Sequence, residues 1–588
     1  MKHTRTLLAA TLALTLAACG QQGQVSAPVA AAPSPTTSGE GAYLVGFKES
    51  GLGAQSLSAQ DLAAQAQLQA QAITAAGGQL TGQWAEISAA AARLSPEALA
   101  RLQQNPLVEY VEPDLVRRAL GVRSGGTDAG AARTSLGTQA LTAQATPLYT
   151  ASGEYTWGDS ALRVANLRTG NYTGAGVAVC IGDTGIDGNH PEFARKLKGF
   201  KNFITTEANR GDPYQLNDVS HHGTHVAGTV FAQYGAGTGA AGGQSGMDPN
   251  GVGGVASGVN LYMARVLGDD GGGASSGVIN GVNWCASQLK SQGGTEDRVV
   301  ISLSLGGGRA SKTEQRAYTN VYSKGALIVA ATGNDGAAVS YPAAYDNVVG
   351  VGAIDDAGAK ADFSNFGTQV DLVGPGVHVL SSIPLGQGTR ASASGGGVTF
   401  SDVQAADLSG KGTFSGTIVR AGDGTGTAGG NEFCGTSTRN AALSGQIALI
   451  ARGTCSFEEK TANAVASGAK AVMIYNNAAG PLGMSLTNAY SVPVVGLTQA
   501  DGQGLLTKLP TTGTASVTGA DYEYFDGTSM ATPHVSAAAA VVWAAKPTLT
   551  NTQLLNLLTS TAKDLGTAGK DNNFGYGLVD PLKAITGQ

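Results

Sequence analysis

A serine in the segment 525–535 (FDGTSMATPHV) has the setting of a nucleophile. Ser529 precedes an alanine-rich apolar run that carries no charged residue until Lys546. Such a run predicts a helix that is apolar on every side, which belongs in the middle of a large protein or in a membrane. Pro533 is expected in its first turn, where a missing N–H loses no partner. Ser529 would then lie near unpaired helix N–H groups that can hold a developing negative charge, although a simple N-capping serine is the alternative.

Three further segments carry groups that could assist such a serine. A serine hydroxyl needs an imidazole to take its proton, and that imidazole needs a carboxylate to orient it. Asp183 follows an apolar run in the sequence DTGID, and His222 opens an apolar helix in HGTHVAG. Asn334, in ATGN, follows another apolar run, where its amide could donate to an oxyanion or simply make a turn. The residue types for acyl transfer are therefore all present.

Taken singly, these segments allow other chemistry. Asp183-Thr184-Gly185 would also fit half of an aspartic protease dyad, but the sequence has no second Asp-Thr-Gly or Asp-Ser-Gly. His222 and His225 could both bind a metal, but the glutamate that a zinc protease places beside its histidines is missing.

Length and composition limit the class of protein. A chain of 588 residues should divide into three or four units. Charged residues make up only 13% and glycine reaches 87 residues, which favours a compact exported protein with many tight turns. The net charge of −6 is spread along the chain without a Lys/Arg run, so nucleic acid is not an expected partner.

The N-terminus predicts export. Lys2 and Arg5 precede a short apolar run that is typical of a signal peptide. The sequence LAACG then resembles a bacterial lipoprotein cleavage box, which would make Cys19 the lipidated first residue; ordinary cleavage after a small residue is the alternative. We expect a secreted, extracellular protein that touches a membrane only through such an anchor.

The remaining cysteines are even in number, which favours disulfides in an exported protein. Sequence alone allows three pairings of these four residues. They are Cys180, Cys285, Cys434 and Cys455.

Periodicity divides the chain into segments. Continuous apolar runs at 177–181, 299–303, 327–331 and 348–351 alternate with helices, which predicts an α/β fold with a doubly wound, mainly parallel sheet. Ligands bind such sheets at the carboxyl ends of the strands. The predicted segments are a signal peptide at 1–18, a tether at 19–40, a small α+β unit at 41–117, a linker at 118–155, the α/β domain at 156–383 and 521–588, and an inserted unit at 384–520.

The motifs DTGID, HGTHVAG, SLGG, ATGN and GTSMATPH together resemble the subtilisin-like serine proteases, or subtilases, over 156–383 and 521–588. The Asp, His, Ser order is the one that subtilisin has. The resemblance implies that Asp183 orients, His222 is the general base, Ser529 is the nucleophile and Asn334 stabilises the oxyanion. Thr332 replaces the alanine of many relatives, which would narrow the first specificity pocket. A substrate channel that pairs with the peptide backbone is implied for Ser304, Leu305, Gly306, Ala331, Thr332 and Gly333.

Two more resemblances concern the flanking units. The run EYVE at 109–112 resembles the tail of the inhibitor-type propeptide of subtilisin-like proteases, which would act as an intramolecular inhibitor and assist a slow, non-local fold. GQIALIARGTCSF, GAKAVMIYNN and SVPVVGLTQADG resemble a protease-associated (PA) domain. Cys434 and Cys455 flank its first strand and would pair. Cys180 and Cys285 would then meet across the sheet, unless they are buried free thiols.

The resemblance also implies structural calcium. Oxygen ligands are those that calcium prefers. The positions that match calcium sites of relatives are Glu192, Asp248, Asn250 and Val252.

The sequence therefore predicts a secreted serine endopeptidase, made as a self-processed precursor and acting as a monomer on polypeptide substrates. The alternative from another class is a catalytically decayed surface protein in which the protease frame only presents the PA-like module. An absent member of the triad would favour that alternative, and none is absent.

Overall fold

The computed structural model describes residues 39–48, 58–123, 147–207, 210–235, 251–400, 403–406, 408–422, 432–436, 438–478 and 482–588. The predicted signal peptide and Cys19 lie outside these residues. None of the helices within the described ranges combines the length and apolarity needed to cross a membrane.

A seven-stranded sheet forms the centre of the molecule, and every neighbouring pair in it is parallel. Its strands, in the order in which they lie, are β15 (Leu372–Pro375), β14 (Val348–Ile354), β13 (Leu327–Ala331), β11 (Val299–Leu303), β7 (Ala178–Asp183), β9 (Asn260–Arg265) and β8 (Gly199–Asn202). After β7 the chain forms the edge strand β8 and then returns to insert β9 between them; from β11 it builds outward in the other direction through β13, β14 and β15. The connections therefore diverge between β7 and β11, where a parallel sheet leaves a crevice for ligands.

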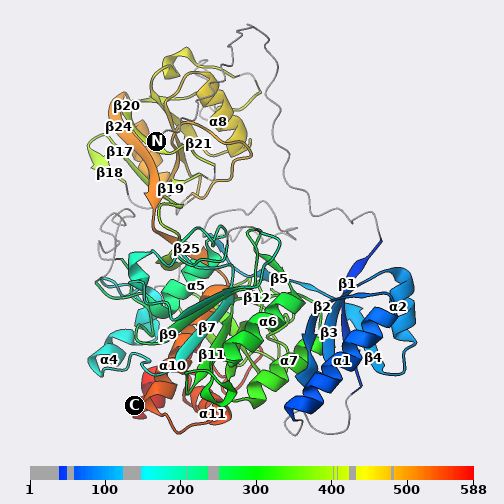
Figure 1. The fold of residues 1–588 in the computed structure, drawn as a ribbon. Helices are drawn as coiled ribbons and strands as arrows, with labels where there is room; N and C mark the ends of the chain where they lie inside the picture. The colour runs from blue at the N-terminus through cyan, green and yellow to red at the C-terminus, as the bar shows by residue number, and fades with distance from the viewer. Residues whose placement is uncertain are drawn as a thin grey trace, which may run out of the picture.

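Helices cover the sheet on both faces, as the apolar strands require. α5 (His222–Phe231) and α10 (Thr528–Ala545) pack together on one face, and α6 (Ser275–Ala286) pairs with α7 (Lys312–Ser323) on the other (Figure 1). Shorter helices complete this domain: α3 (Trp157–Ala161), α4 (Val164–Thr169), α11 (Asn551–Thr561) and α12 (Pro581–Thr586).

The apolar helix α10 is buried inside the protein. All of its residues from Thr528 to Trp543 are buried, and it contacts β15, β14, β11 and β13. The expectation for Pro533 was wrong: the helix begins at Thr528, so the proline lies in its second turn. The carbonyl of Ser529 thereby loses its helical donor, and the Ser304 hydroxyl replaces it at 2.8 Å.

The N-terminal unit is a four-stranded antiparallel sheet with two helices, coloured blue in Figure 1 beside α6 and α7. The predicted α+β character of this unit agrees with the structure, although the run of alanines in its strand β3 would by itself favour a helix. Here Ala89 to Ala92 are almost fully buried on both sides of the sheet. The elements are β1 (Gly41–Phe47), α1 (Ala59–Ala75), β2 (Gln79–Trp84), β3 (Ala89–Leu94), α2 (Pro96–Gln103) and β4 (Val108–Pro113).

The inserted unit leaves and rejoins the host on one antiparallel ribbon. β16 (Val379–Ser382) pairs with β25 (Tyr522–Asp526), so the two ends of the insert lie side by side. The unit has its own eight-stranded sheet with separate apolar clusters on its two faces. It contains β17 (Gly388–Gly395), β18 (Val398–Thr399), β19 (Gln404–Ala405), β20 (Gly412–Arg420), β21 (Ile447–Ala451), α8 (Phe457–Ala466), β22 (Ala471–Tyr475), β23 (Val494–Leu497), α9 (Gln499–Leu506) and β24 (Thr511–Ala520).

Both expected disulfides are present. Cys180 in β7 joins Cys285 in α6 with a Cα–Cα distance of 5.7 Å. Cys434 joins Cys455 within the insert at 5.8 Å. The first bond ties the strand that ends in Asp183 to a helix on the opposite side of the sheet from α5.

Candidate active site

Asp183 and His222 form a buried pair at the carboxyl end of β7. The Nδ1 of His222, the first residue of α5, lies 2.7 Å from Oδ1 of Asp183. The carboxylate also accepts the Thr184 N–H at 2.7 Å, and both side chains are almost completely buried. An ionised aspartate in this position makes Nδ1 the protonated nitrogen and leaves Nε2 able to accept a proton.

A second buried carboxylate, which the sequence analysis missed, holds α5 against β7. Asp218 accepts hydrogen bonds from Thr184 Oγ1 at 2.8 Å and from the Thr224 N–H at 2.7 Å. Burial raises its pKa, and these bonds oppose that effect. The contact is so close that a Cβ on Gly223 would lie 2.1 Å from the Gly185 carbonyl. Gly185 in DTGID and Gly223 in HGTHVAG thus allow α5 to pack closely against the turn that follows β7.

Ser529 lies at the start of α10 and exchanges hydrogen bonds with Ser304. Its Oγ donates to the Ser304 carbonyl at 2.8 Å and accepts the Leu120 N–H at 3.1 Å. Leu120 belongs to the segment that follows the N-terminal unit, 409 residues earlier in the chain. A peptide segment of the protein itself therefore lies against the candidate nucleophile.

The carbonyl oxygen of Leu120 is held by two donors. Asn334 Nδ2 lies 2.7 Å away, and the Ser529 N–H lies 3.3 Å away. Asn334 is oriented because its Oδ1 accepts both the N–H and the hydroxyl of Thr528, at 2.9 and 2.8 Å. A Cβ on Gly527 would come within 2.3 Å of this oxygen, so glycine keeps the position open. Donors placed in this way are suited to stabilise a negative charge on the oxygen they contact.

The imidazole adjoins the other side of the same peptide bond. A Cβ on Gly121 would lie 2.9 Å from Nε2 of His222 and 2.9 Å from Sδ of Met530. The structure thus brings Asp183, His222, Ser529 and Asn334 together around the Leu120–Gly121 bond.

The segment before Leu120 lies in an extended channel as an added strand. β5 (Val116–Ala119) pairs antiparallel with β12 (Leu305–Gly306) on one side and with β10 (Gly272–Ala274) on the other. The Leu120 N–H also reaches the Ser304 carbonyl at 3.3 Å. Of the edge predicted at Ser304, Leu305 and Gly306, the last two residues pair with this segment of the protein's own backbone, and the Ser304 carbonyl accepts from it.

The second edge differs from the prediction. In the described sheets β10 pairs with β5 where Ala331, Thr332 and Gly333 were expected to do so. The N–H of Thr332 bonds the Val351 carbonyl at 3.1 Å, and Gly333 donates to the Thr528 hydroxyl at 3.2 Å. Their backbone is engaged in the central sheet and the base of α10. The narrowing of the pocket by Thr332 stays a prediction.

Two other histidines near the site are structural. Nε2 of His225 bonds the carbonyls of Val379 and Glu523 at 3.0 and 3.1 Å. Burial lowers the pKa of His225 to about 3 and that of His534 to about 4. Both remain neutral at ordinary pH, so neither adds a second base.

Only two of the expected calcium ligands, Glu192 and Val252, lie within the described residues. Oε1 of Glu192 accepts the Tyr522 hydroxyl at 2.6 Å and the Val252 N–H at 3.2 Å, and both of these are donors. Burial raises the pKa of Glu192 to about 7. Asp248 and Asn250 lie outside the described residues, and no acidic or Cys/His cluster suited to a metal occurs within them.

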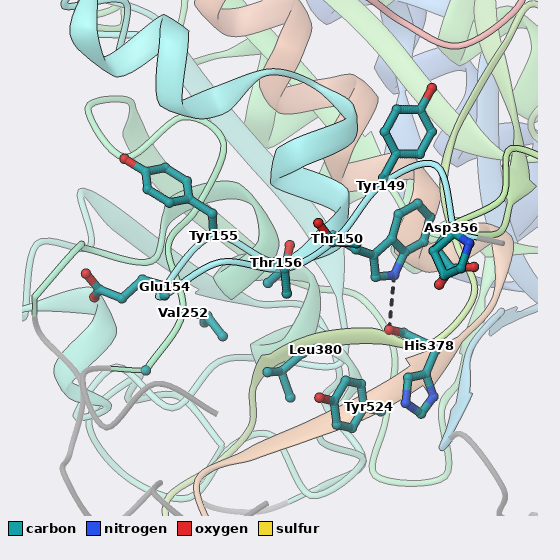
Figure 2. A pocket seen from close by; sticks show the side chains of 15 residues that line it. Tyr149, Thr150, Glu154, Tyr155, Thr156, Val252, Asp356, His378, Leu380 and Tyr524 are labelled. Carbon is teal, nitrogen blue, oxygen red and sulfur yellow. Dashed lines mark hydrogen bonds between the residues drawn. The ribbon is translucent and has the colours of Figure 1, made fainter. Parts of the chain in front are cut away.

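A cavity of about 280 Å³ lies elsewhere on the domain. In Figure 2 its wall includes Tyr149, Glu154, Asp356 and the stacked rings of His378 and Tyr524. None of the four predicted catalytic residues lines it. The predicted catalytic residues lie instead beside the segment 116–121.

A buried Asp–His pair, a serine at a helix start and an oxyanion hole, all at the carboxyl edge of a parallel sheet, define a serine peptidase. The sequence profile of the Subtilase family matches residues 174–465 and 487–577. Subtilisin NAT from Bacillus subtilis subsp. natto is 31% identical over 385 residues, 65% of this chain and 81% of that protein. Subtilisin BL from Lederbergia lenta is 38% identical over 229 residues, 39% of this chain and 74% of that protein.

A solved structure agrees with these relatives. The psychrophilic subtilisin-like protease from Pseudoalteromonas sp. AS-11 superposes with a TM-score of 0.51 and 30% identity, covering 74% of this chain and 97% of its own. The chain belongs to the subtilase family of subtilisin-like serine peptidases. The predicted subtilisin-like α/β fold is thereby confirmed.

Proposed function

We propose that this protein is an exported serine endopeptidase made as a precursor that cleaves itself between Leu120 and Gly121. One observation carries the proposal: the Leu120 carbonyl lies between Asn334 Nδ2 and the Ser529 N–H, beside the Ser529 hydroxyl. Peptide substrates would occupy the same channel after this segment leaves.

The reaction would proceed by acyl transfer. Ser529 Oγ attacks the carbonyl carbon of Leu120, and His222 Nε2 takes its proton while Asp183 holds the ring. The hydroxyl must first turn away from the Ser304 carbonyl. Negative charge develops on the oxygen that Asn334 and the Ser529 N–H already hold. His222 then returns the proton to the amine of Gly121, which leaves, and water hydrolyses the acyl ester.

The N-terminal unit, 41–117, would serve as the inhibitory propeptide. Two carboxylates at the end of this unit bind the N-termini of α7 and α6. Glu112 accepts the N–H groups of Lys312 and Thr313 in α7 at 3.0 and 2.9 Å. Asp114 accepts the N–H of Ser276 in α6 at 3.0 Å. Carboxylates favour such positions because the first N–H groups of a helix are unpaired and carry partial positive charge. Docking in this way would hold Leu120 in the channel.

Three further predictions from the sequence remain part of this proposal. They are the signal peptide at 1–18, lipidation of Cys19, and a PA-like identity for the insert at 384–520. The antiparallel ribbon of β16 and β25 supports the insertion, because it brings the ends of the insert together.

A fluorophosphonate probe tests the proposed chemistry. We expect one probe molecule to bind each processed protein molecule, at Ser529 alone. The rate of casein hydrolysis should fall in proportion to the fraction of protein that is labelled. Peptide mapping by mass spectrometry locates the label. A processed, folded protein that stays unlabelled would favour the decayed binding protein instead.

The position of self-cleavage can be tested by enlarging one residue. Valine at Gly121 would force a side chain against His222 Nε2 and Met530 Sδ, each 2.9 Å from the added Cβ. We expect Gly121→Val to slow processing on the order of 100-fold, since displacement of the reacting bond by about 1 Å costs that much. The measurement is the amount of fragment that begins at Gly121, followed by mass spectrometry.

Gly504→Val is the matched control, because a Cβ there meets no atom within 4 Å. It should process at the wild-type rate. A Gly121→Val protein that matures at the wild-type rate to a product with a different N-terminus would rule out this bond as the site.

A further inference from the structure

Two adjacent arginines in the occupied channel have very different surroundings. Arg117 and Arg118 are the fourth and third residues before the bond held at Ser529, and they point to opposite sides of strand β5. The Arg118 side chain is 52% exposed and its nearest carboxylate oxygen, on Asp270, is 3.7 Å away. The Arg117 side chain is only 1% exposed. Position 117 therefore enters a closed pocket in the wall of the channel.

A carboxylate lies at the bottom of this pocket. Arg117 Nε donates to Oε1 of Glu314 at 2.9 Å, and Nη2 donates to Oε2 of the same residue. Nη2 also donates to the Arg309 carbonyl at 2.9 Å. The Glu314 side chain is fully buried under the arginine. A fork of two N–H groups on two carboxylate oxygens fits a guanidinium and does not fit an ammonium group.

The pocket is part of the domain and does not belong to the propeptide. Glu314 lies in the first turn of α7, whose N-cap Ser311 fixes the turn by accepting the Glu314 N–H. The hydroxyl of Tyr345 donates to Glu314 Oε2 at 2.9 Å, which holds the carboxylate in place. These contacts lie within the domain itself, so they do not depend on the segment 116–120.

We propose that Glu314 is a specificity-determining residue that selects peptides with arginine at the fourth position before the cleaved bond. This inference rests on the proposed function and names the substrate class of the same site. The peptides preferred would carry arginine there, a leucine-sized residue at the bond and glycine after it. Leu120 packs on Gly306, where a Cβ would lie 2.7 Å from Leu120 Cδ1. Arg118, being exposed, adds little, as solvent-exposed ion pairs do.

Peptides that differ at one position test the proposal on the processed enzyme. The probes are fluorogenic peptides containing Xaa-Arg-Ala-Leu-Gly-Val, in which Xaa is arginine, lysine, leucine or the neutral arginine isostere citrulline. For wild type we expect kcat/KM to be about tenfold or more higher with arginine than with citrulline, because hydrogen bonds between charged partners are the stronger ones. In Glu314→Gln this ratio should fall to within about twofold of one.

The matched control is Glu296→Gln. Glu296 is likewise buried and accepts a tyrosine hydroxyl, that of Tyr262 at 2.7 Å, but it precedes β11 at the opposite end of the strands from the active site. For Glu296→Gln, the ratio of kcat/KM with the arginine peptide to kcat/KM with the citrulline peptide should equal that of wild type. Because Glu314→Gln also removes the carboxylate partner of Arg117 in the precursor, the double variant Arg117→Gln, Glu314→Gln provides a second route to the same processed enzyme.

The outcomes separate two failures. Equal hydrolysis of all four peptides by wild type, or an unchanged preference in Glu314→Gln, would overturn the proposal while the peptidase stands. If wild type cleaves none of the peptides and does not process itself, the proposed function fails and this inference fails with it.

Discussion

Ser529→Ala should accumulate as the full-length precursor and should hydrolyse no protein substrate. The alanine removes the only hydroxyl that contacts the Leu120 N–H in the described structure, while the rest of α10 remains buried. Loss of the serine lowers kcat by about six orders of magnitude in subtilisin itself, and we expect an effect of that size here. Gel electrophoresis and intact mass measure whether residues 41–120 stay attached.

Ser536→Ala is the control for the helix. Ser536 is buried on the same helix and bonds the Ser302 hydroxyl at 2.9 Å, away from the channel. It should mature normally. If Ser529→Ala were to mature at the wild-type rate in a purified preparation, cleavage would not be autocatalytic.

Asn334→Ala should lower kcat by about 10²–10³-fold and leave KM nearly unchanged. Its amide bonds the Leu120 oxygen at 2.7 Å, and such a donor acts mainly when charge develops on that oxygen in the transition state. The expected loss is about 3–4 kcal/mol of barrier, as for the corresponding donor in subtilisin. Steady-state kinetics on a peptide ester and a peptide amide measure it.

Asn556→Ala, an exposed amide on α11, serves as the comparison and should keep both constants. The Asn334 variant also removes the acceptor for Thr528, so its melting temperature is needed. An increase in KM with an unchanged kcat would show that Asn334 binds the ground state and the transition state equally, contrary to the proposed role.

Local pattern predicted the chemistry and much of the central sheet. β11 and β13 begin and end at the residues where the apolar runs 299–303 and 327–331 do. Because those strands are buried on both faces, every residue in them is under pressure to be apolar or small, and the sequence shows a continuous apolar run. The motifs around Asp183, His222 and Ser529 also contain glycines. Only the structure shows why glycine is needed there: at Gly223, for example, a side chain would collide with the backbone of Gly185.

Elements with weak local signals were missed for a related reason. β8 (Gly199–Asn202) lies at the sheet edge and is half exposed, so it has no apolar run. β10 (Gly272–Ala274) has almost no side chains, and its backbone becomes a strand only by pairing with β5. In both cases the partner strand supplies the stabilisation that propensity does not.

The sequence by itself determined the class of reaction, the nucleophile segment and most strands of the sheet, because each is marked by a short motif or apolar run. Only the tertiary structure decided which peptide bond the site holds and which side chain recognises it. Leu120 reaches Ser529 across 409 residues, and Arg117 reaches Glu314 across 197. Sequence periodicity reports only on residues that are close together in the chain. It therefore could not predict the contact between Leu120 and Ser529 or the buried ion pair between Arg117 and Glu314.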